Sequence, residues 1–113
     1  MGNEISSLKA NDILITNAAS NLANINTRDY KSIRTTIIGG RDGKVSVTTE
    51  RSKESGIPLE NGHEASNVDI PREIMDMMRA KTGYESALKA IKAIDETLKS
   101  VMDILMPDPG AGG

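Results

Sequence analysis

The sequence predicts a mainly α-helical protein, in which a pair of long amphipathic helices at the two ends is joined by a small β-hairpin and an irregular loop. Three observations predict this fold. Apolar residues recur at helical spacing in residues 5–30 and again in residues 68–106. The segment between them is short, polar and rich in turn residues. Two β-branched runs in that segment flank a glycine-rich turn.

The N-terminal segment, residues 1–30, is predicted to form one helix over residues 5–22 or 5–25. Its apolar residues follow steps of three and four, and Asp12 interrupts them. The stripe consists of Ile5, Leu8, Ile15, Ala19 and Leu22, widened by Leu14, Ala18 and Ile25. An Asn-rich run, residues 20–27, follows. Because short amide side chains bond the backbone locally and tolerate left-handed geometry, this run predicts the end of the helix.

The middle segment, residues 31–66, changes to the pattern of β-strands. Residues 33–38 and 44–49 are rich in β-branched side chains, and Gly and Asp residues lie between the two runs. This pattern predicts a hairpin. An isolated hairpin is marginal in water, so we expect this one to lean on the helices or on a neighbouring subunit. The rest of the segment contains Gly56, Pro58 and Gly62, which predict an irregular return loop.

The C-terminal segment, residues 67–106, carries the strongest helical pattern. Asp69 can cap the helix, and Pro71 falls in its first turn, where a missing N–H does no harm. Apolar residues then alternate steps of three and four over about five heptads. This seam consists of Ile70, Ile74, Met77, Lys81, Tyr84, Leu88, Ile91, Asp95, Leu98, Met102 and Leu105, with Lys81 and Asp95 as polar exceptions. Two prolines predict its end, and residues 107–113 are predicted to be a flexible tail.

Composition narrows the classes of partner. The 113 residues carry a formal net charge of −2, and no segment has the basic footprint of a nucleic-acid binder. No apolar run approaches the roughly 20 residues that span a bilayer, so direct membrane insertion is not expected. The N-terminus lacks the pattern of a secretory signal. With two Tyr, no Phe and no Trp, the chain has little material for a large core, and we expect an assembly part completed by partners.

No constellation of residues predicts catalysis. The chain has no cysteine and a single histidine, His63, in a Gly- and Asn-rich loop, which is expected to be a surface residue rather than a metal ligand. The acidic residues of the C-terminal segment are spread along the polar side of a helix, as on a solvated face. The sequence therefore predicts no enzyme, no catalytic residue, no metal site, no cofactor and no small-molecule substrate.

Two motifs resemble the bacterial flagellar basal-body rod protein family, the rod and hook axial proteins. Residues 20–31, SNLANINTRDYK, resemble the N-terminal signature, with Arg28-Asp29 in place of the common Pro-Gly. The C-terminal helix of the family is resembled by residues 66–70, the run EIMDMM at 73–78, Tyr84-Glu85, Ile91-Lys92 and residues 95–98. The chain is similar to a short, divergent member.

The resemblance implies that the two terminal helices form an antiparallel, coiled-coil-like pair. It also implies a structural subunit of the rod that polymerises through these helices. Its expected partners are copies of itself, other flagellar rod and axial proteins, and the flagellar type III export apparatus. The expected location is the periplasm-spanning rod of the basal body, reached without a cleaved signal peptide. The alternative is a small helical-hairpin adaptor or regulator that binds one partner helix.

Ten residues are candidate assembly or partner-binding positions. From the N-terminal motif they are Asn21, Asn24, Asn26, Thr27 and Tyr30, and from the C-terminal seam they are Tyr84, Leu88, Ile91, Leu98 and Leu105. The motif residues either terminate the helix locally or fix the exit of the chain and touch the next subunit. The seam residues either pack within the chain or divide between the first helix and neighbouring subunits.

Overall fold

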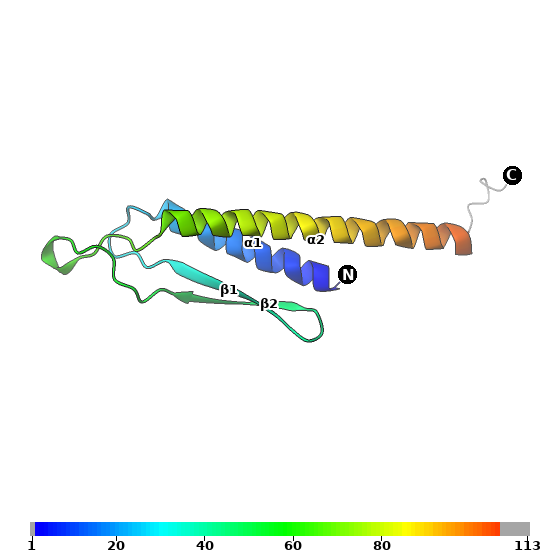
Figure 1. Ribbon diagram of the computed structural model, residues 1–113, viewed down its shortest axis with the longest axis horizontal. Helices are drawn as coiled ribbons and strands as arrows, with labels where there is room; N and C mark the ends of the chain where they lie inside the picture. The colour runs from blue at the N-terminus through cyan, green and yellow to red at the C-terminus, as the bar shows by residue number, and fades with distance from the viewer. Residues whose placement is uncertain (1, 107–113) are drawn as a thin grey trace.

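The computed structural model describes residues 2–106, which form an elongated molecule (Figure 1). Helix α1 spans Gly2–Ala23 and helix α2 spans Ile70–Leu105. Between them lie strand β1 (Ile33–Gly39), strand β2 (Val45–Arg51) and a short 3₁₀ helix, η1 (Glu60–Gly62). The two long helices and the hairpin are the predicted elements, so the helical fold with a β-hairpin is confirmed. The predicted tail, residues 107–113, lies outside the described residues.

The two helices lie side by side and run antiparallel (Figure 1). Their contact is built largely from small residues. On α1 the buried residues are Ala10, Leu14, Ala18 and Asn21, and on α2 they are Glu73, Ala80 and Ala87. Gly83 lies on the same side of α2, where an added Cβ would meet the side-chain amide of Asn11. Small side chains let the two helix backbones approach closely, and this proximity sets the geometry of the core.

Coiled-coil pairing along the predicted heptad seam is not confirmed. The seam residues Tyr84 and Leu88 are 40% and 45% exposed, whereas Ala80 and Ala87 are buried. The physical reason is steric, because a close contact through Ala and Gly leaves no room for Tyr or Leu between the helices. Heptad spacing thus identified an apolar face of α2, but a face of small residues beside it packs against α1.

The hairpin pairs β1 with β2 in antiparallel register, from Ile33 opposite Arg51 to Gly39 opposite Val45. Gly43 takes φ +80 in the turn, a conformation that glycine adopts without strain. One face of the hairpin rests on α1. Asn17 of α1 donates to the hydroxyl of Thr35 (2.9 Å), and the Val45 N–H donates to the Ser6 hydroxyl (3.0 Å). The hairpin leans on the N-terminal helix, as expected.

The return loop leads from the hairpin to α2. It contains η1 and an isolated antiparallel bridge between Pro58 and Glu64. A side chain at Gly56 would place its Cβ 2.0 Å from the Ala65 carbonyl oxygen, so only glycine fits there. At the end of the loop, Asp69 caps α2 by accepting from the Arg72 N–H (3.3 Å), and a proline follows in the first turn. Both predicted start signals of α2 are confirmed.

Candidate functional site

The side-chain amide of Asn21 joins three elements at one end of the molecule. Its Nδ2 donates to the Ile33 carbonyl (3.0 Å) and to Glu73 Oε2 (2.9 Å). Its Oδ1 accepts from the Ile33 N–H (2.8 Å) and from the Tyr30 hydroxyl (2.9 Å). Two donor and two acceptor positions of the amide are therefore used. Asn21 connects α1 to the start of β1 and to the first turns of α2.

Glu73 is the charged partner in this junction and is only 2% exposed. Burial raises the pKa of the Glu73 carboxyl, and the nearby Asp76 adds to that effect. The hydrogen bond from Asn21 and the positive charges of Arg34 and Arg72 oppose the rise in pKa. Burying a charged carboxyl costs free energy unless a hydrogen-bonding partner is in place. The fold therefore favours the arrangement of the helices that supplies this partner.

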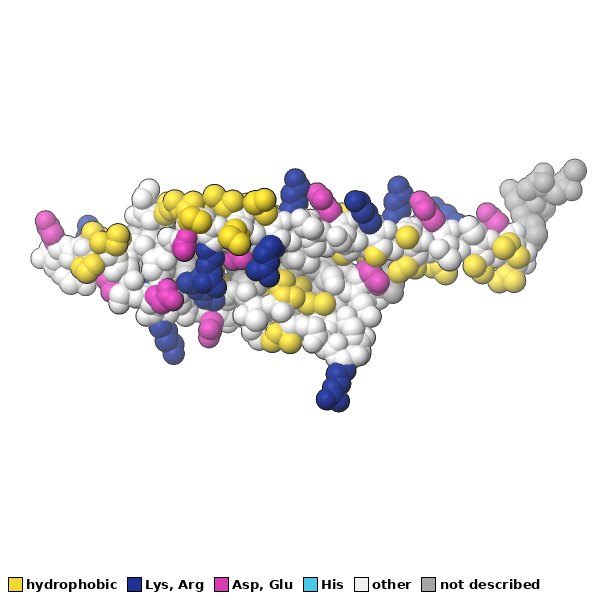
Figure 2. Space-filling view, in the orientation of Figure 1, with side chains coloured by type: hydrophobic (Ala, Val, Ile, Leu, Met, Phe, Trp, Pro, Cys, Tyr) yellow, Lys and Arg dark blue, Asp and Glu magenta, His cyan; other side chains and the backbone are white. Residues whose placement is uncertain are grey.

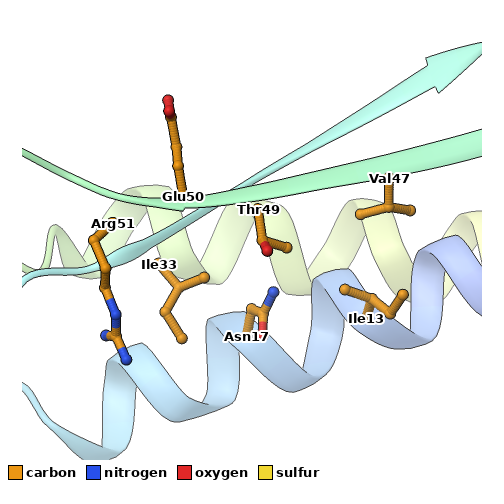
Figure 3. A pocket seen from close by; sticks show the side chains of 7 residues that line it. All are labelled: Ile13, Asn17, Ile33, Val47, Thr49, Glu50 and Arg51. Carbon is orange, nitrogen blue, oxygen red and sulfur yellow. The ribbon is translucent and has the colours of Figure 1, made fainter.

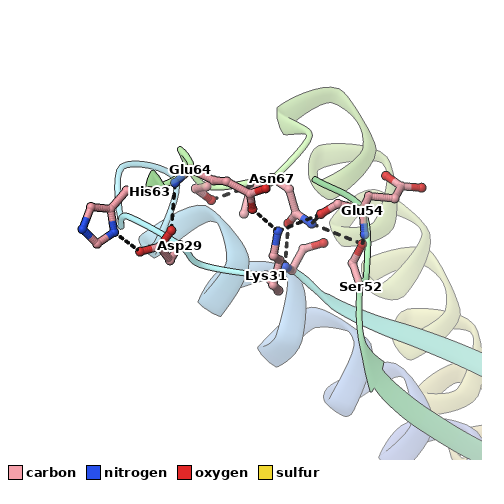
Figure 4. A network of polar contacts seen from close by, with 10 residues as sticks. Asp29, Lys31, Ser52, Glu54, His63, Glu64 and Asn67 are labelled. Carbon is pink, nitrogen blue, oxygen red and sulfur yellow. Dashed lines mark hydrogen bonds and ion pairs between the residues drawn. The ribbon is translucent and has the colours of Figure 1, made fainter. Parts of the chain in front are cut away.

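A second amide, that of Asn67, connects the hairpin to the start of α2 (Figure 4). Its Oδ1 accepts from the Ser32 N–H (2.7 Å). Its Nδ2 donates to the Ser52 hydroxyl (3.2 Å) and to the Glu54 carbonyl (2.9 Å). Both strands of the hairpin are thus attached at their open end. Asn67 thus connects the end of the return loop to the hairpin, as Asn21 connects α1 to the start of β1.

A clasp of charged residues, Asp29, Lys31, His63 and Glu64, joins the turn after α1 to the return loop (Figure 4). Asp29 Oδ2 lies 2.7 Å from His63 Nδ1, and Oδ1 accepts from the Glu64 N–H (2.8 Å). Lys31 donates to the Glu64 carboxylate (2.5 Å). The Glu64 N–H and then His63 lower the pKa of Asp29, and the hydrogen bond from Lys31 lowers the pKa of Glu64.

Asp29 also adopts φ +59, a left-handed conformation that is uncommon outside glycine but tolerated by Asp. Its backbone N–H donates to the Glu64 carbonyl (2.8 Å), so the turn is held from both sides. In the family motif that residues 20–31 resemble, glycine is common at this position. The clasp therefore stabilises a left-handed turn that Asp adopts less readily than glycine does.

The remaining motif residues act locally. Asn24 donates to the Ser20 carbonyl (2.8 Å), and the Thr27 hydroxyl donates to Asn24 Oδ1 (2.9 Å). Asn26 is exposed. The structure thus brings Asn21 and Tyr30 together, while Asn24 and Thr27 close the end of α1. A direct role of these residues in contact with another subunit stays a prediction.

The seam residues of α2 lie largely on its surface. Ile91 is half-buried, while Leu98 and Leu105 lie in the part of α2 that extends beyond the start of α1 (Figure 1). Asn3 and Glu4 of α1 lie beside Ala87 and Ala90 of α2, and α2 runs on to Leu105. We call the uncovered apolar side chains on one side of this helical extension the overhang stripe. It consists of Leu98, Val101, Met102 and Leu105.

The overhang stripe continues the face of α2 that contacts α1. From Ala80 and Ala87, steps of three, four and seven residues lead to Ile94, Leu98, Val101 and Leu105, which places them on one side of the helix. The side chains are small where α1 packs and large where α1 is absent. Leu98 is 53% exposed and Leu105 is 71% exposed. A contiguous exposed stripe of this kind is typical of an interaction surface.

A second uncovered apolar surface lies between the two helices. This groove, which we call the helix groove, has a volume of about 360 Å³ and is lined by Ile15 of α1 and by Ile74, Met77, Met78 and Lys81 of α2. Figure 2 shows yellow side chains gathered over the first part of α2 and again near its C-terminal end. Methionine adapts to differently shaped partners. The helix groove is therefore suited to bind an apolar side-chain ridge.

A further hollow, of about 570 Å³, lies between α1 and the hairpin (Figure 3). Ile13, Asn17 and Val47 are among its lining residues, and Glu50 points away from α1. It holds no convergent set of acid, base and nucleophile. Over residues 2–106 there is also no cluster of three or more His, Cys, Asp or Glu residues that could hold a metal ion. Within the same residues, neither long helix has the length and apolarity needed to cross a membrane.

Sequence reasoning named neither Glu73 nor Asn67 nor the four clasp residues as candidate site residues. A signal for Glu73 exists, since it shares a seven-residue spacing with Ala80 and Ala87 and so lies on the small-residue face. For Asn67 and Asp29 we find no comparable signal, because the partners of their side chains lie 13 to 35 residues away in the chain.

A comparison with known families matches the C-terminal segment. Residues 63–104, a little over a third of the chain, match the family model described as flagellar basal body rod FlgEFG protein C-terminal. Over this segment the chain is similar to the flagellar basal body rod family. A search of curated proteins returned no match. The N-terminal motif, residues 20–31, lies outside the matched segment.

The family match supports a structural role in the flagellar basal body, and the rod family is structural rather than enzymatic. The matched residues include His63 of the clasp, both residues Asn67 and Glu73 of the junctions, and Leu98 of the overhang stripe. Ile15 of the helix groove, Asn21, Asp29 and Leu105 lie outside the matched segment.

Proposed function

We propose that this chain is a structural subunit of the flagellar basal-body rod that polymerises through its terminal helices. Its partners are copies of itself and other rod proteins, and it reaches the rod by the flagellar export apparatus without cleavage of a signal peptide. The observation that supports this most is the overhang stripe, a face of α2 that leaves large apolar side chains exposed beyond the end of α1.

The free energy of apolar burial supports a chain that a neighbouring subunit completes. Burying one Leu, Ile, Val or Met side chain contributes about 1.5–3 kcal/mol, so leaving four of them in water forgoes a substantial part of the stability of a small domain. A neighbouring subunit that covers the overhang stripe would recover it. Because a contact between two different patches repeats from copy to copy, it produces an open polymer rather than a closed pair.

The experiment is deletion of the gene in its source organism, with swimming and electron microscopy of purified basal bodies as measurements. We expect truncated or missing rods, restored by the wild-type copy. The Leu98→Asp/Leu105→Asp variant should fail to restore them, whereas a Thr97→Asp/Ser100→Asp variant, with the same added charge on exposed polar positions of the same helix, should succeed. Normal basal bodies in the deletion strain would reject the proposal.

The adaptor alternative rests on the helix groove, which could hold one partner helix. An adaptor would form a stoichiometric complex of fixed size and would not extend into a polymer. Analytical ultracentrifugation over a wide concentration range separates the two, because only a polymer grows continuously with concentration.

A further inference from the structure

We propose that Asn61 is a site of spontaneous deamidation and that the clasp sets the rate of this modification. In deamidation an asparagine side chain closes on the next backbone nitrogen, and the residue becomes a mixture of aspartate and isoaspartate. Asn61 lies in η1 of the return loop, the green loop at one end of the molecule (Figure 1). The modification site is independent of the proposed rod function.

The sequence and the surroundings of Asn61 favour the reaction. Asn61 is followed by Gly62, and no other asparagine of the chain is followed by glycine. Glycine leaves the attacking backbone nitrogen unshielded by a side chain and gives the backbone more freedom to rotate. Asn61 and Gly62 are both exposed, and nothing lies within 4 Å of the place that a Cβ at position 62 would occupy. Water therefore has access to both residues.

The chemistry needs only the chain and water. The Gly62 nitrogen forms a bond to Asn61 Cγ, and the bond from Cγ to Nδ2 breaks. Nδ2 leaves as ammonia and takes up the proton of the Gly62 N–H, so a succinimide ring remains. Water then opens the ring. Addition of water at Cγ gives aspartate, and addition at the backbone carbonyl gives isoaspartate, in which the main chain runs through Cβ and Cγ. Neither step oxidises or reduces the chain.

The turn at Asn61 keeps the two reacting atoms apart. Asn61 takes φ 60 and ψ 33, and Gly62 takes φ +77. The His63 N–H donates to the Glu60 carbonyl (3.2 Å) across these two residues. This is the type I′ arrangement that Asn-Gly favours, since both central residues need positive φ. At this ψ the Gly62 nitrogen is turned away from the Asn61 side chain, so the ring can close only after the turn opens locally.

The clasp holds this turn closed. The segments on either side of the turn are joined by a hydrogen bond from the Leu59 N–H to the His63 carbonyl (2.7 Å). The Asp29 carboxylate fixes the second segment, because it contacts His63 Nδ1 (2.7 Å) and accepts from the Glu64 N–H (2.8 Å) (Figure 4). Loss of these contacts releases the chain directly after Gly62. The rate of deamidation should therefore follow the opening of the clasp.

The test is incubation of the folded full chain at neutral pH, followed by peptide mapping with mass spectrometry and by labelling with an isoaspartyl methyltransferase. We expect modification at Asn61 in the wild type, several-fold slower than in the same chain unfolded in guanidinium chloride. Asp29→Gly, which keeps a left-handed turn at position 29, should raise the rate in the folded chain several-fold. Glu50→Gln, which also removes one carboxylate but from a side chain that points away from α1 (Figure 3), should leave the rate unchanged.

Each outcome supports or overturns this assignment. Modification of Asn61 that Asp29→Gly accelerates and Glu50→Gln does not accelerate supports it. An Asn61 that stays intact in folded wild type and in folded Asp29→Gly, while the unfolded chain is fully modified, would overturn it. Equal rates in wild type and Asp29→Gly would overturn the role of the clasp, as would equal rates in the folded and unfolded chain. If Asp29→Gly loses helix content, Lys31→Gln, which removes the ion pair with Glu64, takes its place.

The modified chain provides a second measurement. Isoaspartate adds one carbon to the main chain of a two-residue turn and a negative charge to the loop that holds Glu64, so the clasp should be weaker in the product. Ion exchange separates the charged product from the native chain. The Glu64 amide of the product should exchange hydrogen several-fold faster than in the native chain. Asn61→Asp, with the same charge on a normal backbone, is the matched control and should show a smaller increase. An unchanged exchange rate in the product would overturn the coupling between the turn and the clasp.

Discussion

The amide of Asn21 donates a 2.9 Å hydrogen bond to the carboxyl of Glu73, and both side chains are almost fully buried. These residues lie 52 positions apart in the sequence, one near the end of α1 and one in the first turns of α2. The bond fixes how the two helices are aligned at their joined end. Among the described residues, Glu73 is the only charged residue that is buried, and it lies at the helix contact.

Removing the Asn21 amide should strongly destabilise the fold. Asn21→Leu leaves the Ile33 N–H and carbonyl, the Tyr30 hydroxyl and Glu73 without their partner. We expect a loss of about 3 kcal/mol or more in the free energy of unfolding, because each buried polar group left unpaired costs about 1–3 kcal/mol. Urea denaturation measures it. Asn26→Leu, at an exposed position, should change the value by less than about 0.5 kcal/mol.

Glu73 should make stability depend on pH. Because its pKa is raised in the fold, the folded chain holds this proton more tightly than the unfolded chain. Its favourable contribution is complete below the ordinary carboxyl pKa and is lost as the pH rises through the raised value. Glu73→Gln, which can still accept from Asn21, should therefore melt at a higher temperature than wild type at pH 7.

The difference in melting temperature between Glu73→Gln and wild type should shrink toward pH 4, where the wild-type carboxyl is increasingly protonated. Glu85→Gln, on the exposed side of α2, is the control and should show no such convergence. A constant difference at all pH values would contradict the assigned cause.

Gly83 and Asn11 should be energetically coupled. An added Cβ at Gly83 would lie 2.6–2.8 Å from three side-chain atoms of Asn11, so that side chain must move. Gly83→Ala should therefore gain little or lose stability in the natural chain. In an Asn11→Ala background the same change should stabilise α2 by about 1 kcal/mol, the usual advantage of Ala over Gly in a helix.

A double-mutant cycle of Gly83→Ala and Asn11→Ala, measured by chemical denaturation, gives the coupling between the two positions directly. Additive effects of the two substitutions would mean that the helices already have room for the extra methyl group at this contact.

The clasp should open in acid. Hydrogen bonds lower the pKa values of Asp29 and Glu64 in the fold, so their stabilising contribution is present above the ordinary carboxyl pKa and is lost as the pH falls through the lowered values. Hydrogen exchange of the Glu64 amide, which donates to Asp29, should accelerate over that range beyond the intrinsic rate change. Asp29→Gly, which keeps the turn conformation but removes the carboxyl, should exchange fast at neutral pH and show no such transition.

Local chemistry could be predicted from the sequence because it acts over a few residues. Asp69 and Pro71 start α2 as predicted, and the β-branched runs form the hairpin with its glycine turn. Asn21 was named as a candidate residue on the strength of the Asn-rich motif. Its bonds to Glu73 and Ile33 could not be predicted, since they depend on how distant segments are placed.

Two amphipathic helices, a hairpin between them and a rod-like C-terminal segment could all be predicted from the order of residues, because period, caps and turn residues are local properties of the chain. The face of α2 that meets α1 could not be predicted in this way, because it depends on how the two helices pack. Ala80, Gly83 and Ala87 offer less apolar surface than the heptad seam, yet they allow the backbones to approach closely enough to pack. Tyr84 and Leu88 consequently remain at the surface, and Leu98 and Leu105 remain there because α2 extends beyond the start of α1.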